Sequence, residues 1–139
     1  MKAFKMHRDC PPGSLLKTGG ARVKAKQDSR NKRPGMSAEH CAQIRDLPCA
    51  ACHSAPAGTV HHLKSQTGER GMGLRATDKW GIPLCMTHHD TIERAGTRNE
   101  GGQCAKWGFN PHDLARALWG ATGMTGTMRK IVMATGGKA

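Results

Sequence analysis

Cys49-Ala-Ala-Cys52 and Cys85-Met-Thr-His88 are the stretches of this sequence that decide its fold. Each pair leaves two residues between its possible ligands, a gap that lets a tight turn point both donors at one ion, and tetrahedral zinc requires four such donors. One C-x-x-C can be a redox pair or a pair of buried small residues, but a second pair of matching spacing predicts a single structural Zn²⁺ held by all four side chains. His53, directly after Cys52, is the weaker alternative ligand.

The two pairs are separated by 32 residues, which exceeds the usual finger spacing of about 12 to 20 residues. A further structure must therefore lie between them. Residues 59–63 form a β-rich run that carries two histidines, residues 64–73 are polar and glycine-rich, and residues 80–84 are a second apolar run. This order predicts a β-hairpin with a long, mobile loop, followed by a helix over residues 88–95 that Gly96 ends.

Helices are also predicted on both sides of this region. Ser37 is a good N-cap for a helix over residues 38–47, which Pro48 stops. Farther along, Asn110-Pro111 is typical of the start of a helix, which we expect to run to residue 119 and to end at Gly120. The predicted fold class is therefore α+β.

The charge is concentrated at the two ends of the chain. The 139 residues are 37% hydrophobic but only 4% aromatic, which predicts one small domain with a thin core. Residues 1–36 carry ten Lys or Arg against two Asp, for a net charge of +8; residues 37–119 carry a net +1, and residues 120–139 carry +3. We expect a disordered basic arm (1–36), a folded domain (37–119) and a flexible basic tail (120–139).

Basic arms of this kind predict a polyanionic partner, with nucleic acid first, because each cation near a phosphate releases a condensed counterion. The alternative is that they are solvated ends that keep the protein soluble. The sequence has no run of about 18 apolar residues and no apolar stretch of a signal peptide at its N-terminus, so a cytoplasmic location without a membrane partner is expected. In a reducing compartment, cysteines are better interpreted as metal ligands than as disulfides. Cys10, Cys41 and Cys104 have no partner in spacing.

The histidines inside the long loop suggest a second constellation. His61 and His62 are adjacent on a predicted strand, so their side chains should point to opposite sides and perform different tasks. On the following helix, Glu93 stands four residues after His89 and therefore beside it. His61, His89 and Glu93 could thus converge on a second ion, leaving His62 free as a base.

At this point the sequence resembles the HNH, or ββα-metal, nucleases, particularly the treble-clef forms in which a zinc knuckle supports an active hairpin and helix. The resemblance covers about residues 48–93 and rests on C-A-A-C, V-H-H-L, the region of Asp78 and P-L-C-M-T-H-H. It implies that His61 and His89 ligate the catalytic ion, that His62 is the general base and that Asp78 orients this base. Phage-encoded recombination-associated nucleases are similar, with H-H, G-x-G, D and P-L-C-x-x-H-H in this order.

The resemblance also implies an activity. We expect a metal-dependent endonuclease that hydrolyses DNA in phage or bacterial recombination or processing, with a recombinase or another loading protein as a possible partner. Relatives often place a histidine where this chain has Glu93, and the carboxylate favours Mg²⁺ or Mn²⁺ as the catalytic ion. The alternatives are a non-catalytic zinc-stapled nucleic-acid-binding module and a protein whose basic ends bind an acidic protein surface.

Basic side chains in the arm, in or beside the hairpin loop and on the following helix are the expected contacts with phosphate, although solvated surface charges would give the same pattern. These residues are Arg30, Lys32, Arg33, Arg70, Arg75, Lys79 and Arg94.

Overall fold

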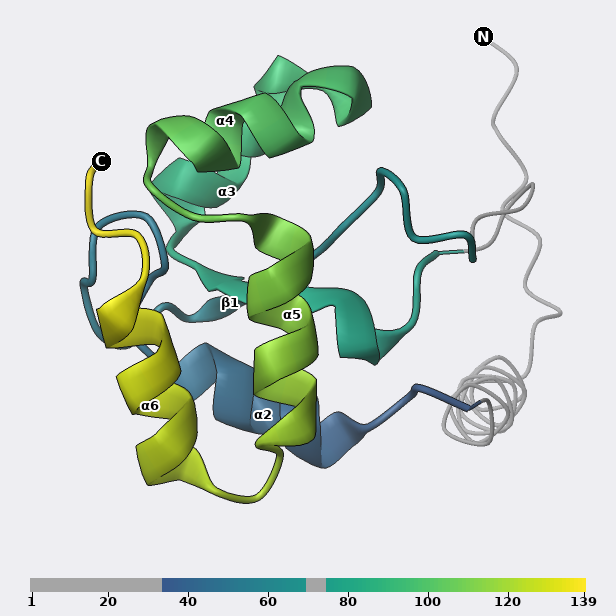
Figure 1. The fold of residues 1–139 in the computed structure, drawn as a ribbon, viewed down its shortest axis with the longest axis vertical. Coiled ribbons are helices and arrows are strands. Elements are labelled where there is room, and N and C mark those ends of the chain that lie inside the picture. Colours follow the sequence, from purple (N-terminus) through teal and green to yellow (C-terminus); the bar gives the residue numbers. More distant parts are fainter. Residues whose placement is uncertain (1–33, 70–74) are drawn as a thin grey trace, which may run out of the picture. The chain divides into compact units, whose positions relative to one another are not determined.

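Two short strands, β1 (Thr59–His62) and β2 (Gly81–Leu84), pair antiparallel, with Thr59 opposite Leu84 and His62 opposite Gly81. They belong to a computed structural model that describes residues 34–69 and 75–139. Within these residues, helices surround the small sheet, and Figure 1 shows β1 between α2 on one side and α3 and α4 on the other. The predicted α+β class and the predicted hairpin are confirmed.

The elements of the described residues follow one another along the chain, with the longest connections on either side of β1. They are α2 (Ala38–Asp46), β1, the single 3-10 turn η1 (Asp78–Trp80), β2, α3 (Met86–Ala95), the 3-10 turn η2 (Thr97–Asn99), α4 (Glu100–Lys106), α5 (Pro111–Gly120) and α6 (Thr125–Ala134).

The helices predicted from local signals begin and end close to the expected residues. Ser37 caps α2, with its hydroxyl accepting from the backbone N–H of His40 at 3.1 Å. Asn110 caps α5 by accepting from two backbone N–H groups, and Gly96 ends α3 with a φ of 80°, a conformation that costs glycine little. Helix α3 begins two residues earlier than predicted, because β2 leads directly into it at Cys85.

The core lies where α2 and α5 pack against the hairpin and α6 packs against α5. Its fully buried apolar side chains come from every one of these elements: Ile44, Leu63, Ile82, Leu84, Leu118, Met128 and Val132. Helix α2 contacts both strands, while α5 contacts β2, η1 and α6. The contacts of α2 and α5 therefore fix the position of the hairpin.

The prediction of a flexible tail over residues 120–139, and of a folded domain that ends at residue 119, is wrong. Residues 125–134 form α6, in which Met128 and Val132 are 0% exposed. Beyond this helix, the N–H groups of Gly137 and Ala139 donate to the carbonyls of Ala50 and Ala51 at 3.1 and 3.0 Å. Burial of apolar side chains outweighs the low helix propensity of the Gly- and Thr-containing segment.

The predicted disordered arm also ends earlier than residue 36. Pro34, Gly35 and Met36 belong to the described structure, and the carbonyl of Gly35 accepts from the N–H of Lys79 at 3.2 Å. A β-carbon on Gly35, whose φ is 83°, would lie 2.8 Å from Oγ1 of Thr77, so only glycine fits there. The rest of the predicted arm, residues 1–33, lies outside the described residues.

Across residues 34–69 and 75–139, no helix has both the length and the apolar character needed to cross a membrane.

Truncating a buried side chain of α6 tests whether this helix is part of the cooperative fold. We expect Met128→Ala to lower the free energy of unfolding by about 2–5 kcal/mol, because it removes buried methylene and methyl groups and leaves a cavity. Met133→Ala is the matched control: Met133 lies on the same helix but is 49% exposed, so a change within about 0.5 kcal/mol is expected. Equal effects in urea denaturation would contradict the assignment of α6 to the core.

Candidate metal centres

Cys49, Cys52, Cys85 and His88 come together in the structure, with one ligand atom from each lying within 4.8 Å of the others. Nδ1 of His88 is 3.1 Å from the sulfur of Cys85 and 3.7 Å from that of Cys49. The two pairs that the sequence singles out thus form one group that could hold a metal ion.

Local backbone geometry positions the first pair. Residues 49–54 form a tight turn, here called the knuckle, in which the N–H of His53 donates to the carbonyl of Cys49 at 2.8 Å. His53 adopts a φ of 61°, a left-handed conformation that closes the turn. Its ring is not in the cluster: Nε2 donates to the carbonyl of Thr135 at 2.8 Å, which ties the knuckle to the end of α6.

The second pair is positioned by the junction between β2 and α3. Cys85 directly follows the strand and precedes the helix, while His88 lies in the first turn of α3. The knuckle is attached to the same strand, since the N–H of Ala50 donates to the carbonyl of Pro83 at 2.9 Å. The ring of His88 packs edge-on against Trp107, with centroids 5.1 Å apart. This packing holds the imidazole toward the thiols.

A second group forms on the other side of α3. His61, His89 and Glu93 each place a ligand atom within 4.8 Å of the others, and Nδ1 of His61 is 3.5 Å from Oε1 of Glu93. The rings of His61 and His89 meet edge-on with centroids 5.2 Å apart. The one-turn spacing on the helix and the strand position of His61 therefore bring together the three residues proposed as ligands.

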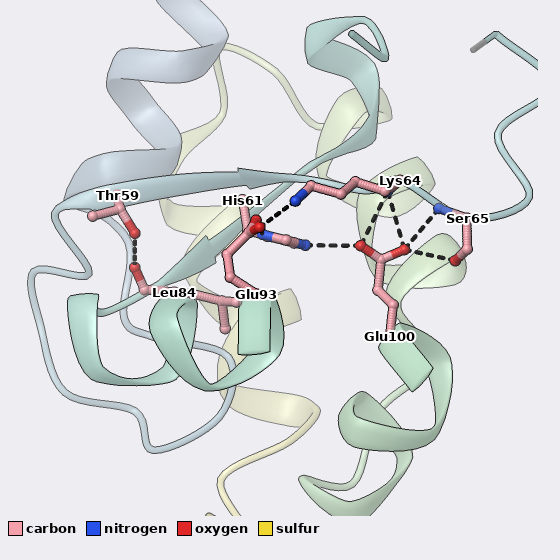
Figure 2. Close-up of polar contacts among 7 residues, drawn as sticks. All are labelled: Thr59, His61, Lys64, Ser65, Leu84, Glu93 and Glu100. Carbon is pink, nitrogen blue, oxygen red and sulfur yellow. Dashed lines mark hydrogen bonds and ion pairs between the residues drawn. The ribbon is translucent and has the colours of Figure 1, made fainter. Parts of the chain in front are cut away.

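Glu100, at the start of α4, fixes the orientation of the His61 ring (Figure 2). Its Oε1 lies 2.9 Å from Nε2 of His61, and both side chains are 2% exposed. Burial opposes ionisation of Glu100, but the bonds from His61, Ser65 and Lys64 outweigh it and lower its pKa to about 2. An ionised carboxylate only accepts hydrogen bonds, so Nε2 of His61 carries the proton.

With Nε2 donating to Glu100, Nδ1 is the ring nitrogen of His61 that can offer a lone pair to an ion. The atom is buried and has no hydrogen-bond partner among the described residues, yet it faces Glu93, as Figure 2 shows. Partial burial, and then the neighbouring His61, lower the pKa of His89. A neutral imidazole is the form that ligates a cation, so the lowered pKa of His89 fits a metal site.

Sequence analysis missed two residues of this group. Glu100 also accepts from the N–H groups of Lys64 and Ser65 and from the hydroxyl of Ser65. Nζ of Lys64 forms an ion pair with Glu93, and this bond is the main reason that the pKa of Glu93 is lowered. Glu100 precedes two glycines in a segment without a helical pattern, so no local signal pointed to it.

His62 points away from this group and meets Asp78. Nε2 of His62 lies 2.8 Å from Oδ1 of Asp78, while Oδ2 accepts from the N–H of Ser37 at 2.9 Å. Burial opposes ionisation of Asp78, but these bonds lower its pKa. The carboxylate thus holds the proton on Nε2 and leaves Nδ1 of His62 as the acceptor.

Three of the residues expected to contact phosphate, Arg75, Lys79 and Arg94, lie in the described part of the chain. Arg75 and Arg94 are exposed, whereas Lys79 pairs with Glu69 at 2.6 Å and lies over the ring of Trp80. Arg30, Lys32, Arg33 and Arg70 lie outside the described residues. The structure adds one basic side chain that the sequence did not single out: Lys64, which lies beside the second group.

A small cavity of about 80 Å³ opens beside the second group, lined by His61, Lys64, Glu93, Thr97 and Glu100 among others. The side chains of Lys64 and Glu93 are 39% and 36% exposed, whereas that of His61 is 2% exposed. Solvent and small ions therefore reach the group from the side of Glu93.

The α+β fold and its Cys/His and His/Glu groups define a candidate metal-binding domain. The chain belongs to the family described as "Protein of unknown function (DUF968)", which matches residues 29–120 and so includes both groups. It is also similar to the uncharacterized protein YdfU of Escherichia coli strain K12, with 34% identity over 61 residues. These residues are 44% of this chain but only 17% of YdfU. No solved structure matches the chain.

Replacing Glu100 tests whether it positions His61 for an ion. We expect Glu100→Gln to weaken binding of Mn²⁺ by about 10- to 100-fold, because a neutral amide no longer fixes the ring tautomer. Binding is measured by the electron paramagnetic resonance signal of free Mn²⁺ on folded protein. Asp113→Asn, an exposed carboxylate paired with Arg116, is the control and should bind normally. Unchanged affinity in Glu100→Gln would show that this carboxylate does not support a metal site.

Proposed function

We propose that this chain is a metal-dependent endonuclease that hydrolyses phosphodiester bonds in DNA. The observation that carries the proposal is the division of roles between two adjacent histidines. His61 directs a buried, unpartnered Nδ1 toward His89 and Glu93, whereas His62 is bonded to Asp78 and presents a free Nδ1. Hydrolysis of a phosphodiester needs both a metal ligand set and a base.

In this proposal, His61, His89 and Glu93 hold one Mg²⁺ or Mn²⁺, which neutralises the phosphate and stabilises the leaving oxygen when bound. A carboxylate among the ligands favours these hard cations. Glu100 keeps the proton on Nε2 of His61, so that the lone pair of Nδ1 points into the group. Lys64 would be displaced toward the phosphate when the ion takes Glu93.

His62 acts as the general base. Asp78 accepts from Nε2 of His62 and stabilises the imidazolium that forms when Nδ1 takes a proton from water. The two rings stand on opposite faces of β1, and within the described sheet β1 pairs only with β2. The phosphodiester would therefore lie along the free edge of β1, where both rings can reach it.

The knuckle and the β2–α3 junction would form a zinc-stapled treble clef. Three thiols and one imidazole suit tetrahedral Zn²⁺, and the order of knuckle, hairpin and helix supports this assignment. The net charge of +8 on residues 1–36 would supply sequence-independent affinity for DNA. A role in recombination or DNA processing, with a loading protein as partner, extends the same proposal.

Removing one donor tests the structural zinc. We expect Cys85→Ser to lose bound Zn²⁺ and the folded state together, because the binding energy of such a site is folding energy. Cys104→Ser is the matched control: it removes a buried thiol that lies outside the Cys/His cluster, so it should keep one Zn²⁺ per chain. Atomic absorption and circular dichroism report the two properties. A Cys85→Ser protein with native ellipticity and thermal stability would contradict the assignment.

Cleavage assays on zinc-loaded protein test the activity. Linear and circular DNA are incubated with Mg²⁺, with Mn²⁺ or with neither, and a strong chelator is avoided because it would also remove structural zinc. We expect cleavage only with the added ion. His62→Ala should slow it by about two to four orders of magnitude while leaving zinc content and DNA affinity nearly unchanged.

His112→Ala is the control for this variant, because His112 donates to the carbonyl of Ser65 and belongs to neither group. It should cleave at the wild-type rate. Wild-type DNA binding without cleavage under any ion condition would instead support the non-catalytic binding module. A His62→Ala protein that cleaves normally would place the base elsewhere.

A further inference from the structure

A third group of possible ligands lies on the side of β1 opposite to His61. Cys41, His62 and Asp78 each place a ligand atom within 4.8 Å of the others. Cys41 comes from α2, His62 from β1 and Asp78 from η1. None of these residues belongs to the other two groups, and Cys41 is neither a metal ligand nor the base in the proposed hydrolysis.

The three donors are held in place independently of any ion. Oδ2 of Asp78 is fixed by the N–H of Ser37, so Oδ1 remains directed at Nε2 of His62, 2.8 Å away. Cys41 is 7% exposed and the side chains of His62 and Asp78 are 12% and 9% exposed. The site is thus small and largely closed to solvent, with its least buried donor on His62.

We propose that Cys41, His62 and Asp78 form a second, weaker zinc site, and that Zn²⁺ bound there inhibits the nuclease by occupying the ring of its general base. The inhibitory effect rests on the proposed function, whereas the zinc site does not. Thiolate, imidazole and carboxylate are the three side-chain ligands that Zn²⁺ commonly takes, and water can complete the tetrahedron.

The distances are suited to such an ion. Zinc bonds of about 2.0–2.3 Å place tetrahedral ligand atoms roughly 3–4 Å apart, and the three donor atoms already lie within 4.8 Å of one another. Magnesium prefers six oxygen ligands and would not accept a thiolate. The group of Cys41, His62 and Asp78 is therefore expected to bind Zn²⁺ in preference to the Mg²⁺ proposed for hydrolysis.

Binding of Zn²⁺ at this group releases one proton to solvent. The Cys41 thiol loses its proton to solvent and its sulfur binds the ion. Nε2 of His62 gives up its hydrogen bond to Asp78 and donates its lone pair to the ion, and the ring becomes the tautomer protonated on Nδ1. One Zn²⁺ enters and one proton leaves. Nδ1 then carries a hydrogen and cannot accept the proton of the attacking water.

The donor set makes this site weaker than the group of Cys49, Cys52, Cys85 and His88. That group offers three thiols and one imidazole, whereas the third group offers one thiol, one imidazole and one carboxylate, and needs water as a fourth ligand. Binding at the third group is therefore expected at higher free Zn²⁺.

Zinc stoichiometry tests the site without reference to cleavage. Full-length wild type, Cys41→Ser and Cys104→Ser are loaded with one Zn²⁺ at the knuckle and then titrated with Zn²⁺ by calorimetry. Wild type and Cys104→Ser should each take up one more equivalent than Cys41→Ser, in which the hydroxyl replaces the thiol. Identical stoichiometry in wild type and Cys41→Ser would overturn the site.

Cobalt provides a second measurement on the wild-type chain, should Cys41→Ser fold poorly. With the knuckle filled by Zn²⁺, added Co²⁺ should produce a near-ultraviolet thiolate-to-metal charge-transfer band that Cys104→Ser retains. A cobalt-loaded protein without this band would exclude Cys41 as a ligand and overturn the proposal.

Cleavage in Mg²⁺ with increasing Zn²⁺ tests the inhibition. Cys41→Ser should cleave at the wild-type rate without added Zn²⁺ and require at least about tenfold more Zn²⁺ for half-inhibition. Equal sensitivity would show that Zn²⁺ acts elsewhere, for example at His89 and Glu93, and would overturn the inhibitory role. If no protein cleaves under any condition, the proposed function and the inhibitory role fail together, while the stoichiometry still decides the zinc site.

Discussion

The convergence of Cys49, Cys52, Cys85 and His88 is the constraint on which the remaining structure depends. It brings together two ligand pairs that are separated by 32 residues. Closing such a loop costs conformational entropy, which the interactions between the two pairs must offset. The loop contains β1 and β2, and the second pair begins α3. The position of this junction therefore decides where the hairpin and the helix meet, and the group of His61, His89 and Glu93 lies at that meeting.

Elements bounded by strong local signals could be predicted from the sequence. Ser37, Gly96 and Asn110 act through their own backbone and side-chain geometry, so their effect is visible without knowledge of the fold. Helices α4 and α6 could not be predicted in this way, because both contain glycine near their start. They form because Cys104, Met128 and Val132 are buried against distant parts of the chain, which no local pattern records.

The same distinction holds for the candidate site. The one-turn spacing of His89 and Glu93 and the alternation of His61 and His62 are properties of single elements, and the structure brings these residues to the places that such periodicity implies. The contacts of Glu100 with His61 and of Lys64 with Glu93 join residues 39 and 29 positions apart. Such pairs depend on tertiary packing, and the resemblance to known nucleases did not include them.

The two adjacent histidines make the same kind of hydrogen bond but differ in how far their side chains are exposed. Each donates Nε2–H to a buried carboxylate, His61 to Glu100 at 2.9 Å and His62 to Asp78 at 2.8 Å, so each presents Nδ1 to its surroundings. The side chain of His61 is 2% exposed, whereas that of His62 is 12% exposed. The buried Nδ1 of His61 faces His89 and Glu93, with which it can share an ion, whereas the more exposed His62 lies closer to the water that a general base must deprotonate. Depth on the strand, rather than the hydrogen-bond partner, therefore separates the proposed ligand from the proposed base.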